Sequence, residues 1–152
     1  MTNALRNTDL TIREKIVSYL SSTSYSSAPV LDGFPDQELL VLPRTIAIEH
    51  DGSTGNFIEI GSRIKEERRI FLIRLYSTLR GDLEDLGELL FSAVHGSTPL
   101  YDYSAGYDSP SSIGTIFFEE ARMSLDKTPT DISGKKVYKG TISFVAIVTR
   151  RG

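Results

Sequence analysis

The side chains best suited to catalysis or ligand binding are two histidines, two neighbouring glutamates and a glycine-containing turn. His50 and His95 stand in neither HExxH nor another recognisable metal-ligand spacing. Glu119 and Glu120 fall in a segment with strand character, so their carboxylates point to opposite faces and are poorly placed to share a substrate. The stretch GSTGN lacks the lysine and the length of a phosphate-binding loop. These patterns predict no enzyme activity, no cofactor and no metal site.

Charged side chains occur in alternating blocks, although the net charge of the 152 residues is only -3. Residues 1–62 carry -4, residues 63–81 carry +4, residues 82–134 carry -8 and residues 135–152 carry +5. Two interpretations are open: solvated faces that happen to follow one another, or complementary surfaces that meet between neighbouring subunits. The basic cluster RIKEERR contains two glutamates and no interleaved aromatic ring, which argues against sequence-specific nucleic-acid binding.

The densest acidic group falls on a segment with helical periodicity. Leu83, Leu86, Leu90 and Val94 recur at helical spacing, and Gly96 is placed to close the helix in a left-handed conformation. Carboxylates in the first turns are stabilised by the helix dipole, by about 0.3–1 kcal/mol each. They are still our candidates for contacts outside the subunit, and basic residues of a neighbour are their candidate partners. The set is Asp82, Glu84, Asp85 and Glu88, with Arg68, Arg69, Arg74, Arg150 and Arg151.

Helices and a loop surround the strands that must position these charges. TIREKIVSYL opens with Thr11 and Glu14 at capping-box spacing, which predicts a short amphipathic helix starting there. The Ser-, Pro- and Gly-rich residues 21–38 predict an exposed loop or arm. It is too short for a domain linker, so we expect residues 1–152 to form a single domain.

Strand periodicity begins at Pro43. RTIAIEH and FIEIGS flank the turn-like DGSTGN and predict a hairpin, and the residues from Arg68 to about Ser77 predict a central strand. SIGTIFFEEARMSL and KKVYKGTISFVAIVTRR predict a long antiparallel hairpin that reaches beyond the body of the domain. The expected fold is α+β: an antiparallel or mixed sheet of about five strands with two helices, in the order α-β-β-β-α-β-β. The expected core includes Ile46, Ile48, Ile58, Ile60, Ile70, Leu72, Leu86, Leu90, Phe117 and Phe144.

The composition also bears on where the chain works. It contains no cysteine, which fits a reducing compartment. The start, MTNALRNTDLTIREK, lacks the apolar core of a signal peptide, and no run approaches the roughly 20 apolar residues needed to cross a bilayer. We therefore expect a soluble protein of the cytosol that binds no membrane.

The order of these segments and their residue patterns resemble those of a known family. LPRTIAIEHDGSTGNFIEIGSR, then RRIFLIRLYS, then an acidic helix and a terminal YKGTISFVAIVTRR look like the tail terminator proteins of long-tailed bacteriophages. These are also called tail completion or head-to-tail joining proteins. The resemblance covers roughly residues 10–150, and the EIGS turn between strands is its most particular point.

The resemblance implies a homo-oligomer, a hexameric ring that caps the tail tube, ends its polymerisation and provides the surface for head attachment. Its partners would be the tail tube protein, a head-completion or connector protein, and DNA that passes without sequence-specific binding. The protein would be made in the host cytoplasm and reside in the virion tail. The acidic helix would then line the lumen, where it repels phosphates, or meet basic residues of the next subunit. A tube or neck subunit and a cellular binding module remain as alternatives.

Overall fold

The computed structural model describes residues 4–32, 44–57, 64–104, 106, 108, 110–126, 128–132 and 134–151. Two helices and seven strands follow one another in these residues. They are α1 (Ala4–Leu20), β1 (Val30–Asp32), β2 (Arg44–Phe57), β3 (Ile64–Ser77), α2 (Arg80–Ala93), β4 (Ser97–Asp102), β5 (Ser111–Leu125), β6 (Thr130–Ile132) and β7 (Lys135–Arg151). The fold is α+β, as expected, but the predicted number of strands was too small.

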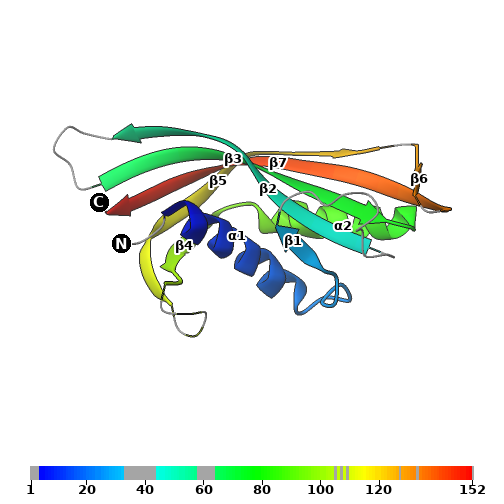
Figure 1. The fold of residues 1–152 in the computed structure, drawn as a ribbon, viewed down its shortest axis with the longest axis horizontal. Coiled ribbons are helices and arrows are strands. Elements are labelled where there is room, and N and C mark those ends of the chain that lie inside the picture. Colours follow the sequence, from blue (N-terminus) through cyan, green and yellow to red (C-terminus); the bar gives the residue numbers. More distant parts are fainter. Residues whose placement is uncertain are drawn as a thin grey trace.

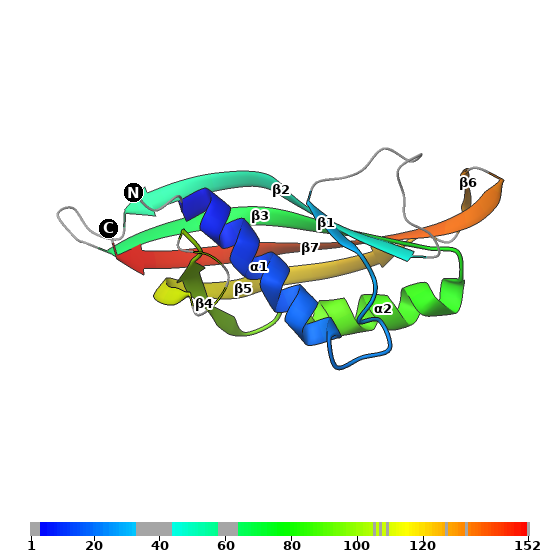
Figure 2. The same ribbon diagram turned by 60° about the horizontal axis from the view of Figure 1, so that its bottom comes forward.

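The strands form one curled mixed sheet in the order β1-β2-β3-β7-β5-β4, and β6 pairs with β7 at one end. The β1–β2 pair is parallel and all the other pairs are antiparallel. Strands β2, β3, β5 and β7 have 14 to 17 residues each, so they run along most of the length of the molecule (Figure 1). The β6–β7 tip lies beyond the end of α2, which agrees with the predicted long terminal hairpin (Figure 2).

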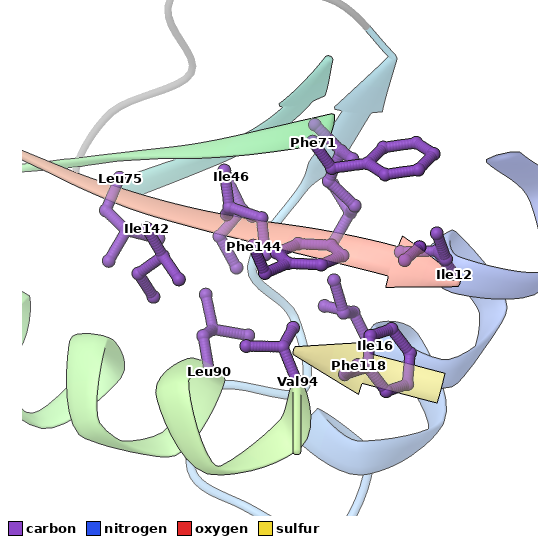
Figure 3. Packing of buried hydrophobic residues seen from close by; sticks show 14 of the residues in the cluster. Ile12, Ile16, Ile46, Phe71, Leu75, Leu90, Val94, Phe118, Ile142 and Phe144 are labelled. Atoms are coloured by element: carbon purple, nitrogen blue, oxygen red, sulfur yellow. The ribbon is translucent and has the colours of Figure 1, made fainter. Parts of the chain in front are cut away.

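Both helices lie on the same face of the sheet, which we call the inner face (Figures 1 and 2). Its core contains side chains from α1, α2 and the four long strands, as Figure 3 shows. Phe144 of β7 stands at the centre, with ring centroids 5.5 Å from those of both Phe71 and Phe118. Ile12 and Ile16 from α1 and Leu90 from α2 pack around these rings and are fully buried.

Helix α1 begins at Ala4, seven residues before the predicted start at Thr11. The capping-box interpretation of Thr11 and Glu14 was therefore wrong. Thr11 is buried in the middle of the helix, and its hydroxyl accepts a 3.2 Å hydrogen bond from the backbone N–H of Tyr101. One turn earlier, the amide oxygen of Asn7 accepts a 3.1 Å hydrogen bond from the Tyr103 N–H. These polar residues attach α1 to β4 and to the residue that follows β4. Thr11 was mistaken for a helix boundary because threonine is also a common capping residue.

The predicted hairpin turn in DGSTGN was also wrong. Residues 51–57 belong to β2, which pairs with β3 from Arg44↔Ser77 to Phe57↔Lys65. The register shifts between His50 and Gly52, so the extra residue is accommodated as a bulge inside the strand. Glycine and aspartate suit a bulge as well as a turn, which is why the pattern misled. The predicted strand residues 58–62, including core candidates Ile58 and Ile60, lie outside the described residues.

Three short strands did not appear in the sequence prediction. Strand β1 lies inside the segment expected to be a loop, where Tyr25 and Val30 are buried; residues 33–38 of that segment lie outside the described residues. Strand β4 contains Pro99 and forms the edge of the sheet, where a missing N–H is tolerated. Strand β6 has three residues and lies between the two segments that were predicted to form the terminal hairpin.

The core prediction was right on the inner face and wrong at two positions on the other. Ile46, Ile48, Leu86, Leu90 and Phe144 are buried, whereas Leu72 is half-buried. Ile70 and Phe117 are 44% and 47% exposed. Successive strand residues point to opposite faces, so the buried neighbours Phe71 and Phe118 place these two side chains outside.

Helix α2 agrees closely with its prediction. Its buried residues include Leu83, Leu86 and Leu90, and Gly96 follows with a φ of 79° in the left-handed region. Gly87 also faces the sheet, and a Cβ at that position would lie 3.0 Å from the Met123 sulfur. The helix therefore approaches β5 closely and keeps its acidic side turned away from the sheet.

Candidate interface surfaces

The acidic residues of α2 do not act as one group. Asp82 is bound within the subunit, because its carboxylate accepts a 2.5 Å hydrogen bond from the Arg44 guanidinium. The same guanidinium lies over the Tyr25 ring, with 5.1 Å between its central carbon and the ring centroid. Asp82 thus joins the start of α2 to β2 and to the turn before β1.

Burial raises the pKa of the Tyr25 hydroxyl, and the carboxylates of Asp82 and Asp85 raise it further. Arg44 acts in the opposite direction because its positive charge stabilises a tyrosinate. The net shift is upward, so the folded chain favours the neutral phenol. The cluster of Tyr25, Arg44 and Asp82 therefore joins elements within the subunit.

The remaining carboxylates of α2 are exposed. Glu84 pairs with Arg80 one turn earlier, at 3.4 Å. Asp85 and Glu88 form no ion pair with a described residue. Together with Leu89 and Ser92 they line a shallow depression of about 350 Å³ on the side of α2 that faces away from the sheet. We call these four residues the α2 hollow.

The candidate arginines of β3 alternate between the two faces of the sheet. Arg69 points inward, is only 4% exposed and pairs with Glu67 at 2.6 Å. Arg68 and Arg74 point to the opposite, outer face, where Arg74 is exposed. Arg68 lies 3.9 Å from both Glu119 and Glu120, at the limit of an ion pair. Arg69 is thus covered within the subunit, while Arg68 and Arg74 remain accessible.

The last two candidate arginines lie at the end of β7. Their backbones pair with Lys65 and Ile64 of β3. The side chains of Arg150 and Arg151 lie outside what the structure describes. Within one subunit, Asp82 pairs with Arg44 and Glu84 pairs with Arg80, and neither of these arginines is among the candidates.

The two histidines have structural neighbours. The His50 ring packs against Phe71, with 5.2 Å between ring centroids. His95 lies against the last turn of α2, where its Nδ1 contacts the Phe91 carbonyl. Among the described residues no three His, Asp or Glu side chains are grouped to hold a metal ion. The helices of the described residues are also too short or too polar to span a membrane.

The sequence prediction missed an apolar surface on the outer face. Figure 1 shows both helices on the opposite side of the sheet. Pairing sets Ile70 beside Val145, and sets Ile147 beside Phe117, so apolar side chains from three neighbouring strands adjoin. We call this surface the outer-face patch; it consists of Ile70, Leu72, Phe117, Val145 and Ile147. Elsewhere on the outer face Tyr76 is buried, whereas Arg74 is exposed.

The signal for this patch was present in the sequence. RIFLIRLYS and TIFF place apolar residues at consecutive positions, so each strand must turn some of them away from the inner core. The sequence interpretation placed both faces of the strand from Arg68 to about Ser77 in the core, because a central strand is often buried on both sides. The two helices cover only one face.

A backbone irregularity lies beside the patch. Glu120 has a φ of 53°, an uncommon value for a residue with a side chain. The register of β5 against β7 shifts between Glu119 and Arg122, so Glu120 belongs to a bulge. Bulges of this kind change the direction of nearby side chains. Here Arg122, beyond the bulge, pairs with Ser143 and lies exposed next to the outer-face patch.

Comparison with known proteins gives a likeness in structure only, since no protein-family model and no curated protein sequence matches the chain. A chain of the virion of a native gene transfer agent particle superposes with a TM-score of 0.51 and 10% identity. The match covers 90% of this chain and 93% of that one. A chain from the extracellular contractile injection system structure described as "PVC sheath/tube terminator in extended state" gives a TM-score of 0.51 and 8% identity.

The second match covers all of this chain but 58% of the other, so this protein spans little more than half the length of that neighbour. At such identities the likeness concerns the fold. Both neighbours come from multi-subunit particles, one a virion and the other a sheath and tube terminator. The chain therefore has a fold that occurs in structural subunits of virions and of tail-like assemblies, including one described as a terminator.

Proposed function

We propose that this protein is a tail terminator. Copies of it assemble into a ring that caps the tail tube, ends tube polymerisation and provides the surface to which the head attaches. Six copies form the ring, DNA passes through it without sequence-specific binding, and the protein remains in the virion tail. The protein acts by binding its partners through its surfaces, and this requires no catalytic residue.

The observation that carries this proposal is the shared fold. It extends over the whole of this chain in the comparison with the sheath and tube terminator structure, and over nine-tenths of it in the comparison with the virion. The family resemblance seen in the sequence supports the same assignment. The exposed apolar patch supports assembly, because a monomeric soluble protein seldom leaves adjoining large apolar side chains uncovered.

A second structural role, as a tube or neck subunit, is favoured by the gene transfer agent likeness, whose description names the virion and no particular part of it. A tube subunit stacks ring upon ring, whereas a terminator forms a single ring and then stops. The two roles therefore differ in what the purified protein builds by itself.

The first experiment tests this difference. We expect light scattering of the purified chain to give one closed oligomer with the mass of a hexamer, and negative-stain microscopy to show single rings. Open-ended tubes at high concentration would favour the tube subunit. A monomer at every concentration would overturn the ring assignment.

The second experiment tests capping. The tail tube protein of the same particle is polymerised with and without increasing amounts of this chain, and tube lengths are measured by microscopy. A terminator shortens the tubes in proportion to its concentration and is found at their ends. Tube lengths that do not respond, together with intact rings of this chain, would contradict the terminator role while leaving the ring in place.

A further inference from the structure

We propose that the outer-face patch of one copy packs against the α2 hollow of the next copy. The inference rests on the proposed function for the existence of a ring, and it adds which surfaces join the subunits. The occupant of the patch is thus a second copy of this chain, which binds in a head-to-tail manner.

The apolar parts of the two surfaces are complementary in kind. Phe117 is 47% exposed and projects from β5, with Ile70 exposed two strands away. The α2 hollow is a depression with Leu89 among the residues that line it. When the Phe117 ring packs against Leu89 in the hollow, the apolar surface of both side chains is removed from water, at about 25 cal/mol per Å² buried.

The charges around these apolar groups are complementary in sign. Arg122 is exposed beside the patch and forms no ion pair with a described residue. Arg68 lies in the same cross-strand row as Phe117, with Ile147 between them, and its described ion-pair partners are both at 3.9 Å. The hollow offers Asp85 and Glu88, which also form no ion pair with a described residue. Complementary charges fix the register of an interface and suppress wrong pairings.

The positions of the two surfaces allow copies to join in a head-to-tail series. Helix α2 packs on the inner face, so its hollow and the outer-face patch lie on opposite sides of the subunit (Figure 1). A contact between two different surfaces leaves a free surface at each end of every dimer, and the series ends only when it closes on itself. A patch that met its own copy would stop at a dimer instead.

Cross-linking distinguishes these arrangements, and the chain has no cysteine of its own to interfere. Ser92→Cys places a thiol in the hollow, and Ser124→Cys places one on the exposed outer face near the patch. With a short bis-maleimide we expect each single variant to remain uncross-linked. A mixture of the two should give a dimer, and the double variant a ladder that ends at the ring size. Dimers of Ser124→Cys alone would overturn the head-to-tail contact.

Charge exchange tests the same contact by rescue. We expect Arg122→Glu and Glu88→Arg each to reduce the assembled fraction in sedimentation by tenfold or more, and the double variant to recover most of it. Lys135→Glu, an exposed change at the β6–β7 tip, is the matched control and should assemble normally. A double variant no better than the single ones would overturn the pairing of these two surfaces.

The apolar contact is tested by a variant and a matched control variant. Phe117→Ser should abolish rings and leave a monomer with an unchanged circular dichroism spectrum. Leu79→Ser removes an even more exposed apolar side chain, 59% exposed, from outside both surfaces and should leave rings intact. Rings that persist in Phe117→Ser refute this interface without touching the terminator role, and a failure to cap tubes refutes that role without touching this interface.

Discussion

Tyr25 contributes to stability in a way that depends on pH. Its pKa is raised in the folded chain, first by burial and then by Asp82 and Asp85. A raised pKa favours the protonated form, so this contribution is complete below the unfolded-state value of about 10 and is lost as pH rises through the folded pKa.

We therefore expect the wild-type free energy of unfolding to fall more steeply above pH of about 10 than that of Tyr25→Phe. Urea unfolding at a series of pH values measures both slopes. Tyr19→Phe, at an exposed ring, serves as the control and should keep the wild-type slope. Equal slopes for wild type and Tyr25→Phe would contradict the raised pKa.

Glu120 carries backbone strain that its neighbour does not. A left-handed conformation costs a residue with a Cβ roughly 1–2 kcal/mol, and glycine adopts it without that cost. Glu119→Gly is a matched control, because both carboxylates lie 3.9 Å from Arg68 and only Glu120 has positive φ. We expect Glu120→Gly to be more stable than Glu119→Gly by roughly 1 kcal/mol or more, measured by chemical denaturation. The reverse order would show that the strain is absent.

At the scale of elements, the buried side of α2 packs the helix against the sheet. Leu90 is fully buried between the helix and the sheet. Leu90→Ala should lower the free energy of unfolding by roughly 2–5 kcal/mol, because it removes apolar contacts and leaves a cavity. Glu88→Ala on the exposed side should change it by no more than about 0.5 kcal/mol. A loss below about 0.5 kcal/mol for Leu90→Ala would show that the buried face is wrongly assigned.

The elements that the sequence predicted well are those with one buried side and a clear period. Helix α2 has leucines at helical spacing, and its limits followed from them and from Gly96. The predicted α1 was too short because Thr11 and Glu14 have the spacing of a capping box, whereas Thr11 is in fact buried in mid-helix and bonded to β4. A tertiary contact made 90 residues away in the chain cannot be seen in local periodicity.

The same limit applies to the candidate surfaces. The sequence identified Asp85, Glu88 and Arg68 as candidates, and they prove to be accessible. It could not separate them from Asp82 or Arg69, whose partners within the subunit depend on the fold. Phe117 was missed because an exposed aromatic side chain in a strand looks like a core residue until the covered face is known.

At the scale of the whole molecule, the two functions considered for the acidic helix predict different results. Changing Asp85 to Asn and Glu88 to Gln together should abolish ring assembly while the monomer stays folded, because in the proposed contact these carboxylates face Arg122 and Arg68 of the next copy. Glu84→Gln should assemble normally, because Glu84 has its partner Arg80 in the same helix. Light scattering and DNA retention are measured for both variants.

Intact rings of the Asp85 and Glu88 variant that now retain DNA would identify these acids as the lumen lining, since repulsion of phosphates would have been lost. If assembly, DNA retention and infectivity all remained unchanged, both functions would fail. The acids would then be a solvated side of the helix.

The central place of β7 also governs the order of folding. It alone joins β3 to β5, so without Lys135–Arg151 the sheet consists of two separate pieces, β1-β2-β3 and β4-β5. Its pairing with β3 reaches from Tyr138↔Ser77 to Arg151↔Ile64, across a large loop that must close first, which is a slow step. Val145 and Ile147 of β7 lie between Ile70 and Phe117, so the outer-face patch is complete only when this last strand has paired. In the proposed ring, a nascent chain would therefore be unable to join its neighbours before its own fold is complete.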